Sequence, residues 1–443
     1  MRLHNKFCLA VLSRTSIVFS LLCVSVSPSS AADAQHPRAL PEPLTLDYAL
    51  AQVHQAHPSL SQGEAGIKAA EADKGLANAR TGFNSRIVAR LRYFEPASIV
   101  VDQSHDDHRL GLIVDKTLYD FGRSGSLVAD ADYRIASEQL KLKDIVHQRR
   151  IKIMRAYFDV LLADIQFYRY NEEMAVEFIN FDKLKNRQEL GQVSELTVIE
   201  AETKYKRIRK LRTRSQGLQR ITRSRLAYII GHAGDLPSTV SRPSNLPHLQ
   251  RKLADAEVLQ QKALDENAIL LALRAEAKAA KNRIEAAEAE SRPLLIGSAE
   301  ANAYSRVRAR NDAWRVNLVL TVPLTTGGSV DAATAKERAE LYRINSELAD
   351  QEEAIKQQVL ELWLELESLM LQRDELLTQS DFRELSLDRS RALYEMEVKT
   401  DLGNAMVKVT ETEREVLATE FNIVLAWEQL DVITGVMPVD LSE

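Results

Sequence analysis

The chain has 443 residues, a formal net charge of −5, 45% apolar residues and 27% charged residues. These values exclude a helical membrane transporter, because each helical pass through a bilayer needs about 20 nearly continuous apolar residues. The longest such run is the short one at 16–26. Glycine and proline are scarce, at 16 and 12 residues, which excludes a collagen-like or low-complexity chain.

The N-terminal segment 1–32 has the order of a secretory signal peptide. Arg2, Lys6 and Arg14 accompany a short apolar stretch at 17–26, which small residues follow. The apolar stretch is about half of a bilayer span, which argues against an uncleaved anchor helix. Removal of this segment would change the formal charge from −5 to −8, because it holds these three basic residues and no acidic residue.

Both cysteines, Cys8 and Cys23, lie inside this segment. Lipidation of Cys23 is not expected, since the bulky Leu22 precedes it where a small residue would be needed. The mature chain is therefore expected to have neither a disulfide nor thiolate chemistry. Export without a later helical span leaves a soluble periplasmic or secreted protein, or a β-barrel protein.

Two landmarks recur along the chain at a constant spacing. The segment 118–123, Leu-Tyr-Asp-Phe-Gly-Arg, has a counterpart in 324–329, Leu-Thr-Thr-Gly-Gly-Ser, at an offset of 206 positions. The segment 190–196 resembles 396–402 at the same offset. Two halves of about 200 residues therefore share one plan, which indicates a duplication.

The repeat predicts the division of the chain. The first structural repeat covers 33–235, a linker rich in Pro, Ser and Asn covers 236–256, and the second structural repeat covers 257–443. Each repeat is expected to contain a helix, two extended segments, a very long helix, a turn and a medium helix. The expected helical regions are 44–83, 122–231, 257–292, 328–396 and 401–434.

The long helix at 328–396 has no proline and no internal glycine. Its apolar residues alternate at spacings of three and four, which is the pattern of a coiled-coil seam. At 1.5 Å per residue, the long helix of each repeat would span roughly 100 Å. Since no compact globule accommodates helices of this length, the mature protein is predicted to be a rod or a tube.

Between the helices lie extended segments in which apolar and polar residues alternate. This period of two runs through 85–93, 108–119, 294–304 and 314–324. Segments of about 9–11 residues with one apolar face are typical of transmembrane β-strands. Barrel hairpins are therefore expected at about 84–119 and 294–324. Two half-buried hairpins of a soluble β-domain are the alternative, because short alternation is a weak signal.

Four strands are too few for a closed membrane barrel. The smallest membrane barrels have about eight strands, and open strand edges are not tolerated in lipid. If these hairpins are inserted, several copies of the chain must pool their strands. Oligomerisation is thus a consequence of the strand count.

This arrangement resembles the TolC family of outer-membrane efflux and secretion channels, the outer-membrane factors. The resemblance covers essentially all of the mature chain, from Leu44 to Gly435. It rests on the strand-to-helix motif 118–123, on its partner 323–328, and on the turn 190–194 with Glu200-Ala201-Glu202 after it. These motifs are specific in combination, since they occur in the right order, at a constant offset and behind a signal peptide.

The resemblance implies a mainly α fold with β structure, built from a duplicated helix–β-hairpin–long helix–helix unit. Such units form a trimer with a twelve-stranded outer-membrane β-barrel and a periplasmic α-helical tunnel. The implied function is the passive exit duct of a tripartite efflux or type I secretion system, without enzymatic activity, cofactor or metal. The implied partners are the homotrimer, a periplasmic adaptor (membrane fusion protein), an inner-membrane pump (ABC or proton-driven) and outer-membrane lipid, with no nucleic acid.

The resemblance also assigns functional residues to the two turns between helices. The expected adaptor-docking residues are Gly191, Gln192, Val193 and Ser194 in the first turn, and Glu397, Val398, Lys399 and Thr400 in the second. The second turn departs from the family, because Glu397 stands where a glycine is usual. The acidic residues of the family's periplasmic constriction are replaced by Gly403 and Met406, which leaves Lys399 and Asp401 as candidates for the aperture.

A soluble periplasmic coiled-coil adaptor of an export system is the alternative function. Such adaptors have one helical hairpin with compact β-domains, whereas this chain has two hairpins. The run 204–225 holds ten Lys or Arg residues and no acid; it is read as a solvated or tunnel-lining helix face rather than as a nucleic-acid surface. A periplasmic enzyme has no supporting constellation of residues.

Overall fold

The computed structural model describes residues 40–436, except for Ala56, Val100, Ser244, 307–310, Glu397, Lys399 and Thr400. Contacts within the chain separate the unit Met1–Ala39 from the unit Leu40–Glu443, and all described residues belong to the second unit. The predicted signal peptide and both cysteines lie outside the described residues.

The described elements follow the same order in both halves of the chain. In the first half they are α1 (Leu46–Ala51), a 3₁₀ turn (Gln52–His54), α2 (Pro58–Ala79), β1 (Phe83–Arg90), β2 (Arg109–Tyr119), α3 (Arg123–Glu189) and α4 (Glu195–Ile229). In the second half they are α5 (Ala256–Glu266), α6 (Ala268–Glu288), a 3₁₀ turn (Ala289–Ser291), β3 (Leu294–Tyr304), β4 (Trp314–Thr321), α7 (Ser329–Glu395) and α8 (Leu402–Ile433). The long helices α3 and α7 have 67 residues each, which corresponds to about 100 Å.

Both shorter helices that precede the strands are interrupted, where the sequence analysis expected continuous helices. In the first half Pro58 opens α2, because proline suits the first position of a helix but not its interior. In the second half Asn267 separates α5 from α6. Its side-chain oxygen accepts hydrogen bonds from the N–H groups of Ile269 (2.9 Å) and Leu270 (3.2 Å). The asparagine thus caps α6 instead of continuing α5.

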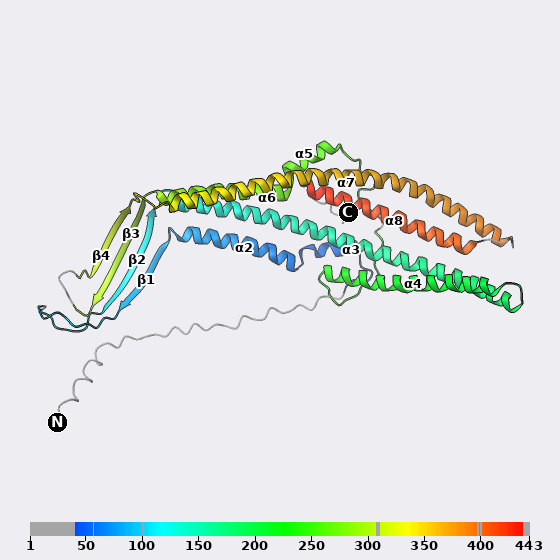
Figure 1. The fold of residues 1–443 in the computed structure, drawn as a ribbon, viewed down its shortest axis with the longest axis horizontal. Coiled ribbons are helices and arrows are strands. Elements are labelled where there is room, and N and C mark those ends of the chain that lie inside the picture. The colour runs from blue at the N-terminus through cyan, green and yellow to red at the C-terminus, as the bar shows by residue number, and fades with distance from the viewer. Residues whose placement is uncertain are drawn as a thin grey trace, which may run out of the picture. The chain divides into compact units, whose positions relative to one another are not determined.

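The helices run side by side, and the sheet lies at one end of them (Figure 1). The helix α3 contacts α2, α4, α6 and α8, and α7 contacts α5, α6 and α8. Buried cores lie where α3, α7 and α8 meet the shorter elements. In the first core the rings of Phe158 and Phe421 stack with centroids 4.1 Å apart.

The segment between the two halves packs against the helices. Leu44 and Val240 form an isolated parallel bridge. The Tyr157 hydroxyl donates to the Ser241 carbonyl at 2.6 Å, and burial raises the pKa of Tyr157 to about 12. Arg251 forms a bidentate ion pair with Asp431, at 2.7 and 2.9 Å. The connection therefore contributes to the packing of the body as well as joining the halves.

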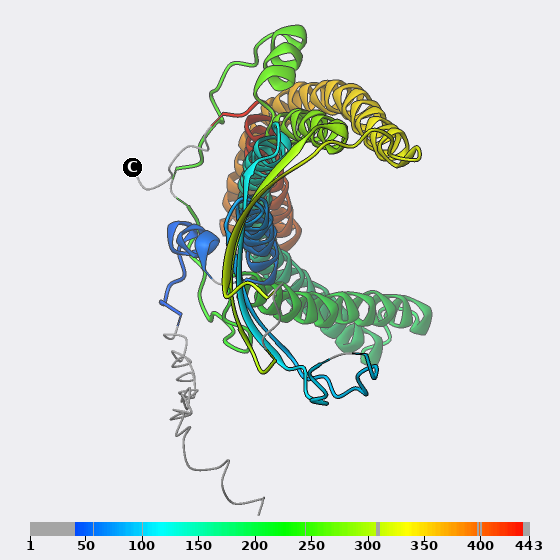
Figure 2. The same ribbon diagram turned by 90° about the vertical axis from the view of Figure 1, so that its left-hand side faces the viewer.

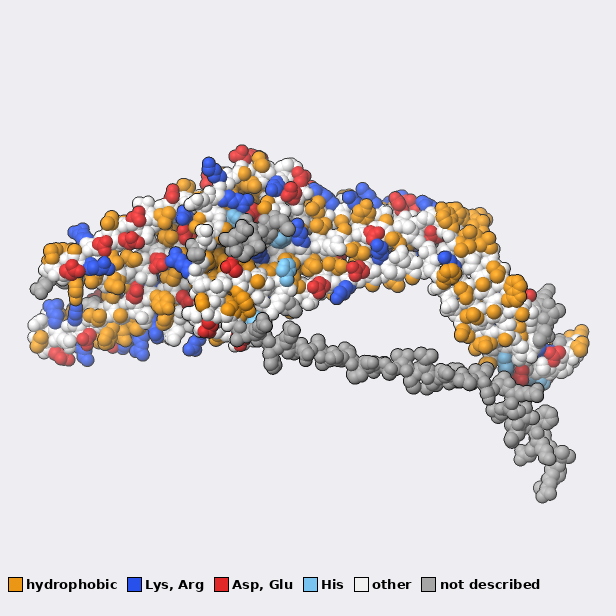
Figure 3. Space-filling model, turned by 180° about the vertical axis from the view of Figure 1, so that it is seen from behind, with side chains coloured by type: hydrophobic (Ala, Val, Ile, Leu, Met, Phe, Trp, Pro, Cys, Tyr) orange, Lys and Arg blue, Asp and Glu red, His pale blue; other side chains and the backbone are white. Residues whose placement is uncertain are grey.

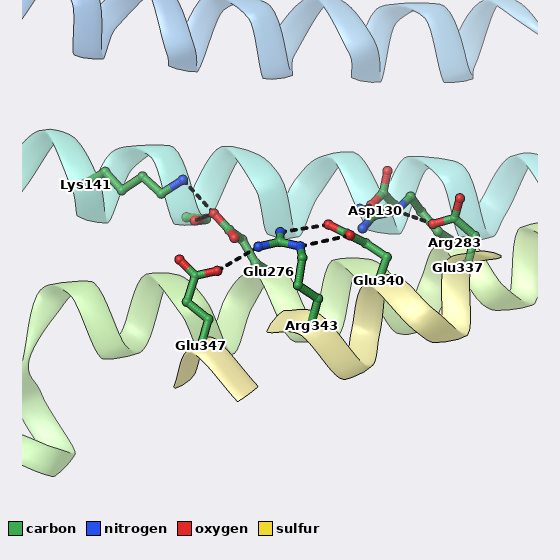
Figure 4. Close-up of polar contacts among 9 residues, drawn as sticks. Asp130, Lys141, Glu276, Arg283, Glu337, Glu340, Arg343 and Glu347 are labelled. Atoms are coloured by element: carbon green, nitrogen blue, oxygen red, sulfur yellow. Dashed lines mark hydrogen bonds and ion pairs between the residues drawn. The ribbon is translucent and has the colours of Figure 1, made fainter. Parts of the chain in front are cut away.

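Polar contacts tie α3, α6 and α7 together nearer the sheet (Figure 4). Arg283 of α6 donates to Asp130 of α3 at 2.8 Å and to Glu337 of α7 at 2.9 Å. Burial raises the pKa of the Asp130 carboxyl, and the adjacent Arg283 guanidinium opposes that rise. Lys141 of α3 similarly reaches Glu276 of α6 at 2.5 Å. Ion pairs thus supplement apolar packing in this part of the bundle.

The four strands form one antiparallel sheet in the order β1-β2-β3-β4. The central pair, β2 and β3, joins the two halves of the chain, and its register shifts at a bulge between Thr117 and Tyr119. After each hairpin a glycine with positive φ, Gly122 (102°) or Gly328 (83°), begins the long helix. This backbone conformation favours glycine, which explains why the recurring motifs share a glycine at this position.

Candidate functional site

The pairing of the strands places residues of like polarity beside one another. Across the sheet Ile87 pairs with Leu112, Leu112 with Ala301, and Ala301 with Trp314. Since successive side chains of a strand point to opposite faces, the next row belongs to the other face; it contains Arg86, Ile113, Glu300 and Arg315. The sheet therefore has an apolar face and a polar face.

The apolar face is exposed. Trp314 and Ile87 are both 73% exposed, although they are large apolar side chains. The other exposed apolar residues of this face include Phe83, Leu110, Leu112, Val316, Leu318 and Leu320. The sheet is curved (Figure 2), and hydrophobic side chains cover its convex side (Figure 3). A contiguous apolar surface of this kind indicates contact with lipid or with another protein.

The two outer strands have open edges. Within the described residues β1 pairs only with β2, and β4 pairs only with β3. The free edge of each outer strand carries backbone N–H and C=O groups without a strand partner, which can pair with a strand of another chain. The sheet can therefore be extended on both sides.

The first turn between helices, 190–194, is narrow and exposed. Gly191 has a φ of +68°, and its N–H donates to the Gln188 carbonyl at 2.8 Å. The N–H of Gln192 donates to the Arg187 carbonyl at 2.9 Å, which closes the end of α3. The Ser194 hydroxyl then accepts from the N–H of Thr197 at 3.3 Å and caps α4. The structure thus brings the four predicted residues 191–194 together on one turn.

The second turn is described in part. Glu397, Lys399 and Thr400, three of its predicted residues, lie outside the described residues. The N–H of Val398 donates to the Leu393 carbonyl at 3.0 Å. Asp401 stands at the N-cap position of α8 and accepts a side-chain hydrogen bond from Asn404 at 2.6 Å. Both turns lie at the end of the helices remote from the sheet (Figure 1).

Exposed apolar residues lie at both turns, and three of them, Leu190, Leu196 and Met396, are not among the predicted docking residues. Leu190 and Leu196 beside the first turn are 72% and 74% exposed. Met396 and Val398 in the second turn are also exposed. Their signal in the sequence is the placement of large apolar residues in a turn, where solvent contact favours polar ones.

The position of Gly403 has a steric reason. A Cβ atom on Gly403 would lie 2.6 Å from the Val176 side chain of α3. Nearby, Arg169 of α3 forms an ion pair with Glu411 of α8 at 2.8 Å. The glycine therefore permits a close approach of α8 to α3.

The described part of the chain has neither a helix that could span a membrane nor a cluster of metal-ligating side chains. No described helix is long and apolar enough to cross a membrane. No group of three or more His, Cys, Asp or Glu side chains in that part could hold a metal ion. In the segment between β1 and β2, the Nε2 atom of His105 lies 2.9 Å from one carboxylate oxygen of Glu95.

Solved structures of outer-membrane proteins are similar to this chain. The outer membrane protein VceC of Vibrio cholerae is 17% identical with a TM-score of 0.70, and the match covers 88% of this chain and 96% of that chain. The CmeC outer membrane channel of Campylobacter jejuni is 10% identical with a TM-score of 0.73, and coverage is 88% and 85%. The open state of the MtrE outer membrane channel of Neisseria gonorrhoeae is 15% identical with a TM-score of 0.67, and coverage is 88% and 89%.

No model of a known protein family and no curated protein matches the chain. The structural similarity nevertheless extends over most of both chains in each pair. The chain therefore has the fold of outer-membrane channel proteins, and the predicted mainly helical fold with a small antiparallel sheet is confirmed.

The geometry of the first turn predicts opposite effects of one substitution at two glycines. Gly191→Ala should destabilise the α3–α4 hairpin by about 1 kcal/mol, because alanine disfavours a positive φ. Gly217→Ala should stabilise α4 by about 0.5–1 kcal/mol, since Gly217 lies in the helix interior and an added Cβ would have no heavy atom of the described residues outside its own turn of helix within 4 Å. Hydrogen exchange of the α4 amides measures both effects, and equal effects of the same sign would contradict the assigned turn geometry.

Proposed function

We propose that this chain is the outer-membrane channel of a tripartite efflux or type I secretion system and acts there as a passive exit duct. A curved four-stranded sheet (Figure 2) with an exposed apolar face and two open edges lies at the end of helices about 100 Å long, and this arrangement supports the proposal. A sheet of this kind is stable in lipid only when its edges are paired.

Three copies supply twelve strands and close the barrel. In that arrangement the free edge of β4 in one copy pairs with the free edge of β1 in the next, and every backbone group finds a partner. The apolar convex face then contacts outer-membrane lipid, while the polar face lines the lumen. The helices α3, α4, α7 and α8 extend into the periplasm and form the walls of a tunnel.

Export by the segment 1–32 delivers the chain to this compartment. The duplicated units 33–235 and 257–443, joined by 236–256, then contribute one hairpin each to the barrel. Outer-membrane localisation is consistent with the similar structures, which are outer-membrane channels. Those similarities are of fold alone, and it is the sheet and the turns of this chain that support the channel function.

The two turns are the docking surface for a periplasmic adaptor, which connects the duct to an inner-membrane pump. The docking residues are Gly191, Gln192, Val193 and Ser194 in the first turn, with Glu397, Val398, Lys399 and Thr400 in the second. The exposed Leu190 and Leu196 add apolar surface beside these residues, as is typical of protein interaction sites. Lys399 and Asp401 line the periplasmic aperture. The duct performs no catalysis and needs no cofactor.

A soluble coiled-coil adaptor is not favoured as the function. Trp314, Val316 and Leu318 are all more than two-thirds exposed in this chain. A soluble protein would therefore expose an extended apolar sheet face to water, which is unfavourable. The similar structures are also channels rather than adaptors.

Insertion through the apolar face can be tested by a pair of neighbouring substitutions. Val316→Lys places a charge on the apolar face of β4, and Asn317→Lys places the same charge on the polar face. A lipid-facing lysine costs about 2–4 kcal/mol near the bilayer midplane, and this penalty recurs in each copy. Val316→Lys should therefore reduce membrane-inserted oligomer at least tenfold, while Asn317→Lys should leave it unchanged.

The measurement is the amount of oligomer in the outer-membrane fraction, followed by conductance of the purified protein in planar bilayers. Equal insertion of the two variants would contradict the assignment of the two faces. A wild-type protein that is monomeric in detergent and never conducts would contradict the channel itself.

If the first turn docks an adaptor, a bulky substitution in this turn should block export and leave assembly of the oligomer unchanged. Ser194→Arg should abolish export in a deletion strain of the source bacterium, because it adds a bulky charge to the docking surface. Ser194→Ala removes the same cap of α4, about 1 kcal/mol, but adds no bulk, so export should persist. Oligomer should form with both variants. Unchanged export by Ser194→Arg would refute the docking role of this turn.

A further inference from the structure

The polar face of the sheet carries more cations than anions. The register places six charged strand residues on it, namely Arg86, Arg90, Arg109, Asp115, Glu300 and Arg315. Four arginines thus face two carboxylates, and each copy of the chain contributes a surplus of two positive charges. If three copies close the barrel, six surplus positive charges line its interior.

The two carboxylates are already engaged by arginines. Glu300 accepts from Arg109 at 3.2 Å and from Arg315 at 2.7 Å. Asp115 forms an ion pair with Arg86 from the neighbouring strand. Arg90 is exposed, and no carboxylate of the described residues forms an ion pair with it. Its charge is therefore available to ions in the space that this face borders.

The arginines are also more accessible than the acids with which they pair. The side chains of Glu300 and Asp115 are 12% and 25% exposed, whereas those of Arg315 and Arg86 are 44% and 57% exposed. In both ion pairs the guanidinium group is therefore the partner that is more exposed to solvent.

The opposite face of the sheet provides an internal comparison. Among the described strand residues Lys116 is the one charged residue on the apolar face, and it pairs with Phe83 across β1 and β2. Its ammonium group lies 4.4 Å from the centroid of the Phe83 ring. Lys116 therefore belongs to the outer surface of a barrel, and Arg90 to the inner surface.

We propose that the barrel lumen is anion-selective, so that small anions pass this segment in preference to cations of similar size. The inference rests on the proposed function, since it requires that copies of the chain enclose the polar face. Low-dielectric walls focus the field of the arginines into the lumen, and rings of arginine or lysine select anions in pores. The duct would accordingly favour cargo with net negative charge.

The test is the reversal potential of single channels in planar bilayers under a gradient of KCl. The wild-type protein should reverse on the side of the chloride equilibrium potential. Because salt screens charges over about 10 Å at 0.1 M and about 3 Å at 1 M, the preference for chloride should be stronger in dilute salt.

Two variants that remove one positive charge from the same sheet separate the lumen from the outer surface. Arg90→Gln should lower the ratio of chloride to potassium permeability at least twofold, and Lys116→Gln should leave the ratio unchanged. Asn317→Asp, which adds a negative charge to the polar face, should lower the ratio as Arg90→Gln does. If Arg90→Gln does not assemble, Asn317→Asp is compared with Lys116→Gln in its place.

The outcomes distinguish the selectivity from the channel itself. A conducting wild-type protein that prefers potassium would overturn the proposed selectivity and leave the channel standing. Equal ratios for Arg90→Gln, Asn317→Asp and Lys116→Gln would overturn it as well. An absence of conductance in the wild-type protein would overturn the proposed function, on which the selectivity depends.

Discussion

Hydrogen bonding of the backbone at the outer strands limits the environments in which this sheet is stable. Within the described residues β1 and β4 each have a single strand partner, and the face that they share is apolar and exposed. Water could satisfy the free N–H and C=O groups, but it would also contact the apolar face. Lipid would cover the apolar face, but it could not satisfy those groups. Both requirements are met when copies of the chain join edge to edge inside a membrane.

The duplication relates this sheet to the turns at the other end of the helices. Because α3 and α7 have the same length, 67 residues, the two turns that follow them reach the same end of the bundle. Ion pairs such as those of Arg283 with Asp130 and Glu337 connect helices of both halves between these ends. A duct that joins a membrane barrel to a periplasmic partner needs long helices, and it needs contacts that hold neighbouring helices together along their length.

Much of this fold could be predicted from the sequence, because its signals are local. Alternation of polarity located the strands, and the absence of Pro and Gly located α7. The breaks at Pro58 and Asn267 escaped prediction. The cap at Asn267 also uses a hydrogen bond from its side-chain N–H to the Ile433 carbonyl, 166 positions away. The close approach at Gly403 likewise depends on Val176 of another helix. Contacts between residues so far apart in the sequence cannot be predicted from the local pattern of polar and apolar residues.

Covalent capture of the strand edges tests whether copies of the chain join edge to edge in the membrane. One cysteine is placed in β1 and one in β4, at a series of registers, in a chain whose two native cysteines lie within 1–32. Oxidation of the membrane-inserted protein should link β4 of one copy to β1 of the next. A closed trimer should give a ladder of cross-linked species that ends at three chains and requires both cysteines. A protein that stays monomeric at every register, or a ladder that continues beyond three chains, would contradict it.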